Sequence, residues 1–444
     1  MVQITTIILG FLFSILCIML ILFFYKNTNS IKLIVFFLFA IIIFNGVMPS
    51  ILIIESGNNI YYSDMLNVIK DYSVYDVLLY YSQNIILVIS TVIGWMLINK
   101  NPKTLKQNIK NSKAVNSNYR IIKNIALLLL LLSIISYYLY SMVYGGFIGL
   151  LDNKEAIRSG ITRDSSFAFL QKFGAFSVFS TLLFTGLLIE KVYKKRDLVW
   201  FVTSFFFSIY YLYSLGGRVT FISFFVTLIL GFTFYRNENR VTKGLIIKVI
   251  LIGFGVILGI YFSTSFFARA TVDLSIFNFF IQELSFPFAS FLMVSNYPGV
   301  FLFKHVLFAP LYFLPSSIWA YKLGFDSASS FNTFLFMGAK KGESGVTGSI
   351  PLDLLSFSWI EGGIIGTIVI GILFGLMLAI LQKNINIIPN KGVRSFIFSY
   401  VAIQFAIMLV NYGDTLHIIQ GEFSFILGFA FLIFCIKKGN YQEK

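Results

Sequence analysis

Runs of about 20 apolar residues recur along the whole sequence, and each is long enough to cross a bilayer as an α-helix. Charged residues make up only 12% of the chain, whereas a soluble protein carries about 25%. The sequence also lacks the alternating segments of about ten residues that mark an outer-membrane barrel. These features predict an all-α integral membrane protein, a polytopic helical bundle whose single transmembrane domain covers residues 1–444.

Eleven apolar runs are predicted as spans, with boundaries uncertain by several residues. They are residues 4–25, 32–54, 76–98, 121–143, 167–190, 198–215, 218–235, 245–265, 357–381, 395–411 and 416–436. Two more apolar stretches lie at 277–320, inside a long outer region at 266–356, and Asn296–Gly299 interrupt them. They form either two spans or a re-entrant hairpin, so the predicted count is 11 or 13.

Most of the 34 lysine and arginine residues fall in loops on one side of the predicted membrane, such as 99–123 and the C-terminal tail. By the positive-inside rule that side is the cytoplasm. The N-terminus is therefore predicted outside and the C-terminus inside, in the inner membrane of a bacterial cell. The net charge of +15 is thus a topology signal, and it gives no reason to expect a nucleic-acid partner.

Several kinds of site are not predicted. Cys17 and Cys435 lie inside apolar runs near opposite ends of the chain, without disulfide or metal-ligand spacing. The first apolar run lacks a basic start and a small-residue cleavage site, which favours a retained span over a signal peptide. The cytoplasmic loops contain no phosphate-binding glycine loop, so no nucleotide cofactor and no metal are expected. Sugar nucleotides are cytoplasmic, so a glycosyltransferase acting at the outer face would need a different donor, for which a lipid-linked sugar is suited.

Arginines on the predicted outer side are exceptions to the positive-inside rule, and they suggest a function. The outer loop 144–166 holds two of them, a tight Gly-Gly-Arg turn between two spans holds a third, and a fourth follows a span. These candidate pyrophosphate-binding residues are Arg158, Arg163, Arg218 and Arg269. A guanidinium binds phosphate oxygens in a planar, bidentate manner. Alternatively, an arginine at a span end reaches lipid phosphate, or pairs with an acid such as Asp152, Glu155 or Asp164.

Three outer residues are candidates for a catalytic base: Glu361, Asp414 and His417. Glu361 precedes a Gly-Gly pair where a span enters the membrane, and helix capping is an alternative role for it. Asp414 and His417 stand three residues apart at a predicted helix start, where an N-cap and a surface imidazole are the alternative. His305 is expected to have a structural role, and Lys340 and Lys341 to lie in a solvated loop.

Three segments give the chain a resemblance to the oligosaccharide repeat-unit polymerase (O-antigen polymerase, Wzy) family. They are NKEAIRSGITRD at 153–164, SLGGRVTFISF at 214–224 and the glycine- and serine-rich block at 330–366. Arg163 and Gly174 also show a spacing described for such loops, with ten residues between them. The resemblance covers most of the chain. The second outer loop departs from the family pattern, because it offers Lys340 and Lys341 in place of arginine.

The resemblance implies a GT-C-like, metal-independent glycosyltransferase that faces the periplasm or exterior. The growing glycan on undecaprenyl pyrophosphate would be the donor, and a lipid-linked repeat unit would be the acceptor. Its partners would include membrane lipids and a chain-length regulator protein. An O-antigen ligase, a flippase for the same lipid-linked glycan, and a transferase using a polyprenyl monophosphate sugar remain alternatives. The last would use the acids of the first outer loop, which are Glu55, Asp64, Asp71 and Asp76.

Overall fold

The computed structural model describes residues 2–26, 32–56, 72–99, 112–159, 168–190, 195–237, 276–315, 317–346 and 348–442. Within these ranges the chain is helical and contains no β-strand, so the predicted all-α class is confirmed. The elements before residue 240 are α1 (Val2–Lys26), α2 (Leu33–Ile41), η1 (Ile42–Val47), α3 (Met48–Ser56), α5 (Val74–Ile98), α6 (Ser112–Met142), α7 (Gly146–Asp152), α8 (Lys154–Ser159), η4 (Ala168–Ala175), α9 (Phe176–Ile189), α10 (Lys195–Ser214) and α11 (Arg218–Arg236).

After residue 270, short helices alternate with long ones. They are α13 (Ile276–Ser295), α14 (Lys304–Leu307), η5 (Ala309–Phe313), η6 (Ser317–Lys322), α15 (Ala328–Met337), α16 (Leu354–Ile387), α17 (Lys391–Val401), η7 (Ala402–Met408), α18 (Leu409–Asn411), η8 (His417–Gly421) and α19 (Phe423–Gln442).

Eight helices among the described residues are long and apolar enough to cross a membrane, which confirms a polytopic architecture. They coincide with eight of the predicted spans, from 4–25 to 395–411. The predicted spans 198–215 and 416–436 correspond to α10 and to η8 with α19, which are not among the eight. The predicted span 245–265 lies outside the described residues. In the 277–320 region α13 is 20 residues long, whereas α14, η5 and η6 have only four to six residues.

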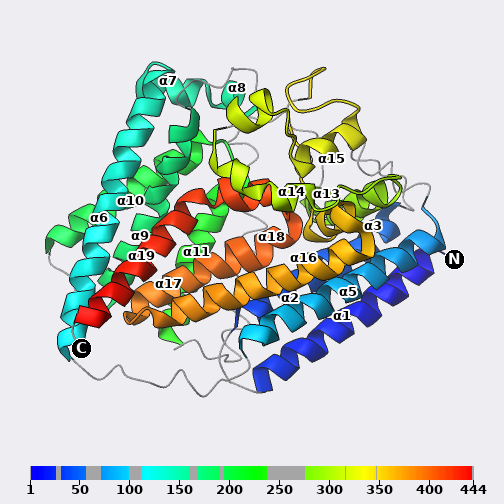
Figure 1. Cartoon of the computed structure of the whole chain (residues 1–444), viewed down its shortest axis with the longest axis horizontal. Coiled ribbons are helices and arrows are strands. Elements are labelled where there is room, and N and C mark those ends of the chain that lie inside the picture. The colour runs from blue at the N-terminus through cyan, green and yellow to red at the C-terminus, as the bar shows by residue number, and fades with distance from the viewer. Residues whose placement is uncertain are drawn as a thin grey trace.

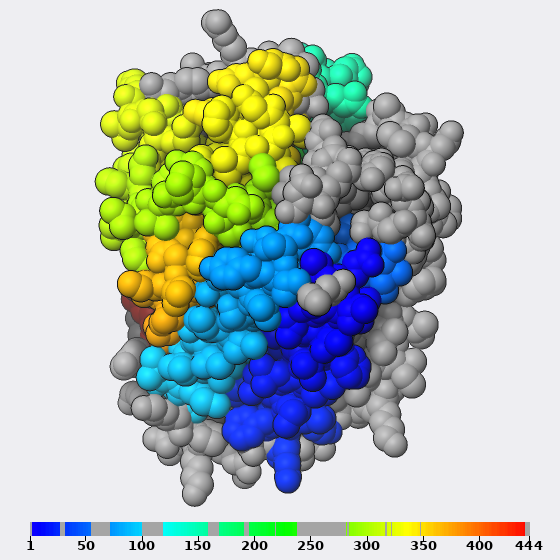
Figure 2. Space-filling model, turned by 90° about the vertical axis from the view of Figure 1, so that its right-hand side faces the viewer, coloured from blue at the N-terminus to red at the C-terminus, as the bar shows by residue number. Residues whose placement is uncertain are grey.

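The long helices form one bundle, with the two ends of the chain at opposite ends of it (Figure 1). Helices α7, α8, α14 and α15 gather at the upper end in this view, which we call the loop-rich end. We call residues 296–337, from the end of α13 to the end of α15, the short-helix layer; with α13 it lies over the ends of α5 and α16 (Figure 2). A layer of short helices on a bundle of long ones provides backbone turns and polar side chains at one end of the molecule.

The seam between α5 and α16 depends on glycine. A Cβ added to Gly375 would lie 2.0 Å from the Thr91 carbonyl oxygen, and one added to Gly94 would lie 2.2 Å from that of Ile372. Gly371 stands one helical turn before Gly375, and a Cβ added to it would lie 2.7 Å from the Cβ of Ser90. Small residues let helix backbones approach closely, which is a main source of helix association in lipid. This contact fixes α16, and α16 carries the candidate residue Glu361.

Replacing Gly375 with leucine is expected to force α5 and α16 apart. Overpacking at such a contact costs about 1–3 kcal/mol or more, because the obstructing atoms belong to the backbone. Thermal denaturation of the purified protein in detergent measures the effect. The matched control is Leu373→Ala on the exposed side of the same helix. Equal denaturation temperatures for the two variants would show that the seam does not stabilise the bundle.

Candidate functional site

Helix α16 is broken at Gly362 and Gly363, two turns after it begins. Gly363 has φ 59° and ψ −136°, a backbone conformation that L-residues with a side chain rarely adopt. The break frees two carbonyl groups for other partners. The amide of Phe301 donates to the carbonyl of Ile360 (2.8 Å), and the amide of Phe303 donates to that of Glu361 (3.0 Å). The break therefore holds the start of the short-helix layer against α16.

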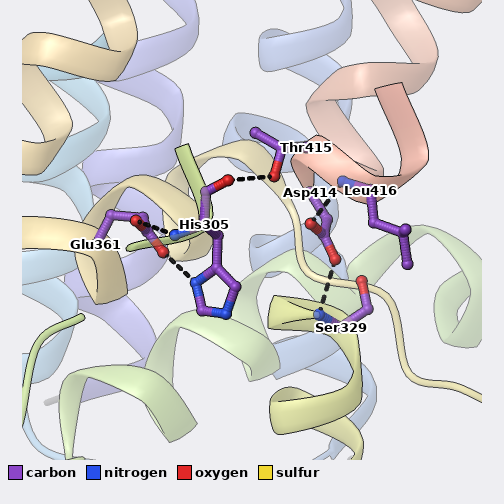
Figure 3. A network of polar contacts seen from close by, with 6 residues as sticks. All are labelled: His305, Ser329, Glu361, Asp414, Thr415 and Leu416. Carbon is purple, nitrogen blue, oxygen red and sulfur yellow. Dashed lines mark hydrogen bonds and ion pairs between the residues drawn. The ribbon is translucent and has the colours of Figure 1, made fainter. Parts of the chain in front are cut away.

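The side chain of Glu361 binds His305 through both carboxylate oxygens (Figure 3). Oε1 lies 2.5 Å from Nδ1 of the imidazole, and Oε2 accepts the backbone N–H of the same residue at 3.2 Å. Glu361 is fully buried and His305 is 3% exposed. The rings of Phe301 and Phe325 pack on the imidazole, with centroids 4.8 and 5.6 Å away. The pair is thus held in one orientation by both polar and aromatic contacts.

The backbone just before His305 is strained. Leu302 and Phe303 have φ values of 51° and 61°, which are uncommon for residues other than glycine. Such conformations cost of order 1–3 kcal/mol each and persist where the surrounding structure enforces them, often at functional sites. Here the two hydrogen bonds to the α16 break enforce them. The strained turn delivers His305 to Glu361.

Asp414 holds the start of two helices at once. Its Oδ1 accepts the amide of Leu416 (3.0 Å), and its Oδ2 accepts the amide of Ser329 in the first turn of α15 (2.9 Å). The residue is 1% exposed. A carboxylate at a helix N-terminus satisfies unpaired amides and meets the positive end of the helix dipole. The geometry therefore matches the capping alternative, extended to a second helix.

Two further residues of this loop, Thr415 and His417, have different surroundings. Thr415 donates from its hydroxyl to the carbonyl of His305 at 3.1 Å, which joins the loop to the strained turn (Figure 3). His417 is half-buried, and its ring lies 5.2 Å from that of Tyr412 at an angle of 30°. Glu361 and Asp414 thus come together around His305, from segments far apart in the sequence, while His417 packs on an aromatic neighbour.

The predicted phosphate-binding arginines lie partly within the described residues. Arg158 on α8 is half-buried, and its guanidinium donates to the carbonyl of Gly216. Gly216 has φ 63°, and with Gly217 it forms the turn before Arg218, the first residue of α11. The structure therefore brings Arg158 to the Gly-Gly-Arg turn. Arg163, Arg269 and the side chain of Arg218 lie outside the described residues.

A lysine adds to the basic character of this turn. Lys154, one helical turn before Arg158, donates to the Tyr213 hydroxyl at 3.0 Å and lies 4.1 Å from the centre of that ring. The N-terminus of α11 also presents its amides and the positive end of its dipole here. We call Lys154, Arg158 and the turn at 216–218 the basic turn. The positive charges of its side chains and the backbone amides of α11 are suited to binding an anion.

Gly174, in the Arg-to-Gly spacing noted in the sequence, has a packing role. A Cβ at this position would lie 2.4 Å from the ring of Tyr211 and 2.8 Å from that of Tyr137. Its carbonyl accepts hydrogen bonds from the hydroxyls of Ser133 and Ser177. A glycine here allows η4 to pack closely on α6 and α10.

Hydrogen bonds of the loop at 411–424 connect η4 with the layer that holds His305. Gln420 on η8 donates to the carbonyl of Tyr312 in the short-helix layer, at 3.1 Å. Ser424 donates to the carbonyl of Lys172 on η4. Glu422, which lies between these two residues, accepts the Tyr400 hydroxyl at 2.8 Å and is 6% exposed. The loop at 411–424 therefore touches both η4 and the layer that holds His305.

Three buried residues at this end of the molecule are not among the site candidates predicted from the sequence: His305, Asp353 and Glu422. Glu422 is the only charged residue of the predicted span 416–436, and a charge inside a span is a signal of function. His305 has no local signal, because its partner is 56 residues away. Asp353 follows the helix-capping rule, since its carboxylate accepts the amides of Leu355 and Ser356 at the start of α16.

Asp353 is fully buried, and burial raises its pKa to about 7. The folded protein therefore binds this proton more tightly than the unfolded chain, whose aspartates titrate near pH 3.9. The stability contributed by this group declines as pH rises from about 4 to about 7, and is constant above that. Asp353→Asn, which keeps the cap, is expected to flatten this decline. Denaturation measured between pH 5 and 9 tests it, and an unchanged slope would contradict it.

No group of three or more His, Cys, Asp or Glu side chains among the described residues is placed to hold a metal ion. Comparison with models of protein families, with curated protein sequences and with solved structures finds no match.

Proposed function

We propose that this protein is a polysaccharide polymerase of the O-antigen or capsule type. It would be a glycosyltransferase that joins oligosaccharide repeat units carried on undecaprenyl pyrophosphate. One observation carries the proposal: helices α8 and α14, which carry Arg158 and His305, both lie at the loop-rich end of an apolar helical bundle (Figure 1). Transfer from a lipid pyrophosphate needs cations for the leaving group and a base for the acceptor hydroxyl.

The basic turn is the proposed leaving-group site. Arg158, Arg218 and the amides at the start of α11 would bind the pyrophosphate of the donor, with Arg163 and Arg269 as further candidates. The loop-rich end would face the periplasm or exterior, with the N-terminus outside and the C-terminus in the cytoplasm, as the basic loops indicate. The bundle would be GT-C-like, with α10 and α19 counted as spans and the 277–320 region held at the outer face.

The short-helix layer supports a role for lipid in the substrate. Large apolar side chains are exposed along it: Val300, Leu302, Leu307, Phe308, Phe313, Leu314 and Leu323. Two lysines, Lys304 and Lys322, accompany them. Apolar side chains with nearby lysines suit the boundary between acyl chains and headgroups. This surface would admit the polyprenyl chains of donor and acceptor beside membrane lipids.

Deletion of the gene, followed by analysis of surface polysaccharide, tests the proposed function in cells. Loss of a polymerase leaves a single repeat unit attached to its final acceptor, because export and ligation continue. Complementation with the wild-type gene restores long chains, whose length distribution would be set with a regulator protein. Loss of every repeat unit, including the single one, would contradict the proposal and favour a ligase or a flippase.

A further inference from the structure

We infer that His305 is the general base of this site and that Glu361 is its positioning residue. The inference rests on the proposed function. It assigns to His305 the removal of the proton from the acceptor sugar hydroxyl. Three observations carry it: the contacts of the pair, the hydrogen bonds that already engage the other candidate groups, and the unpaired polar groups in the aromatic cluster that adjoins the imidazole.

The contacts of Glu361 fix the role of each ring nitrogen. In the neutral imidazole, a carboxylate oxygen 2.5 Å from Nδ1 accepts a hydrogen bond from Nδ1–H, so that Nε2 is the nitrogen with the free lone pair. Nε2 makes no hydrogen bond to any described residue, and Figure 3 shows it on the side of the ring away from Glu361. An imidazole oriented by a buried carboxylate is a general base whose second nitrogen is ready to accept a proton.

The other candidate bases are committed elsewhere. Both oxygens of Asp414 accept backbone amides, one from each of two helices. Both oxygens of Glu361 are used by His305. His417 packs on Tyr412, and no carboxylate among the described residues forms an ion pair with it. Among these groups, only His305 combines a fixed orientation with an uncommitted proton acceptor.

The aromatic side chains around the imidazole also indicate that a polar ligand binds here. The hydroxyl of Tyr312 and the indole N–H of Trp319 are buried without a hydrogen-bond partner among the described residues. The ring of Tyr312 packs on Phe325, which contacts the imidazole, and Trp319 packs on the other side chain of this pair, Tyr312. Buried polar groups are normally paired, so two unpaired donors in the aromatic cluster that adjoins His305 point to oxygen-rich groups that are present during the reaction. Sugar hydroxyls are of this class, because their oxygens accept hydrogen bonds from a phenol O–H and an indole N–H.

The proposed step balances as follows. The acceptor hydroxyl gives its proton to Nε2 of His305 while its oxygen forms a bond to the anomeric carbon of the donor glycan. The bond from that carbon to the pyrophosphate oxygen breaks, and its electron pair leaves with undecaprenyl pyrophosphate. Nδ1 keeps its proton, and the Glu361 carboxylate that accepts its hydrogen bond stabilises the imidazolium that forms. The proton then passes to solvent, and the imidazole is neutral again.

The test uses the full-length purified protein and a synthetic undecaprenyl-pyrophosphate-linked repeat unit. His305→Gln is expected to lower kcat about 10²–10⁴-fold, with the KM for the lipid substrate changed little, because the base acts in the transition state. Glu361→Gln is expected to lower kcat by a smaller factor. The double variant, in which two neutral side chains can still hydrogen-bond, is expected to lose no more than His305→Gln alone, because the two residues act as a unit.

Three results would overturn the inference: wild-type kcat in His305→Gln, losses that multiply in the double variant, or a loss of kcat in His417→Gln that equals the loss expected for His305→Gln. Gel filtration and thermal denaturation of each variant separate lost chemistry from lost folding. If the single variants do not fold, the folded double variant decides, since retained wild-type kcat in it excludes the base. A wild-type protein that makes no polymer would instead count against the proposed function.

Discussion

Arg158→Ala is expected to lower the rate of polymer formation by about 10²–10³-fold. Removing one donor that stabilises developing negative charge has an effect of this size in other enzymes. The guanidinium of Arg158 reaches the turn before Arg218, at the start of α11, where a leaving pyrophosphate would meet a cation and helix amides together. Turnover of the lipid-linked repeat unit by the purified variant measures the effect.

Two further variants make this result specific. Arg158→Lys keeps the charge but not the planar fork, and an intermediate rate is expected. Arg120→Ala removes an exposed arginine from the opposite end of α6 and is expected to leave the rate unchanged. Arg218→Ala is expected to resemble Arg158→Ala. Normal polymer length and rate in a folded Arg158→Ala and Arg218→Ala protein would remove the leaving-group site from the proposal.

Gly363→Ala is expected to reduce both stability and activity. No atom lies within 4 Å of a Cβ added at Gly363, so steric obstruction is not the cause. The cost arises from the backbone conformation, at about 1–3 kcal/mol. Relief of that strain would straighten α16, withdraw the carbonyls of residues 360 and 361 from the short-helix layer, and separate Glu361 from His305.

The matched control for this variant is Ile364→Ala, the next residue, whose side chain is half exposed. It is expected to change the free energy of unfolding by less than about 0.5 kcal/mol, as surface substitutions usually do. Thermal denaturation and turnover are measured for both variants. If Gly363→Ala is as stable and as active as Ile364→Ala, the helix break does not position the pair.

Much of the fold follows from the sequence because hydrophobic length is a local property. Each of the eight apolar helices was predicted from its own 20 or so residues, and lipid leaves an isolated apolar segment few alternatives to a helix. Less apolar segments are harder to assign as spans. Helix α10 is one of them, because Lys195, Arg196 and Asp197 lie in its first turn. The break inside α16 lies at the Gly-Gly pair after Glu361, but the sequence analysis predicted a continuous span there.

The candidate site was only partly predictable, because its contacts join distant segments. Local rules gave Asp414 a capping role as an alternative, and the structure shows that geometry. No local rule relates His305 to Glu361 or Arg158 to Gly216, which are 56 and 58 residues apart. The strain at Leu302 and Phe303 also has no signal in residue type, because tertiary hydrogen bonds impose it.

The most direct test of the proposed function is a reaction of the purified wild-type protein, in detergent or lipid nanodiscs, with one synthetic substrate. That substrate is a single repeat unit linked to undecaprenyl pyrophosphate, without nucleotide sugars. A polymerase yields a ladder of products that increase by one repeat unit, with one undecaprenyl pyrophosphate released for each bond formed. Consumption of no substrate, or transfer only when a lipid A acceptor is added, would contradict the proposed polymerase.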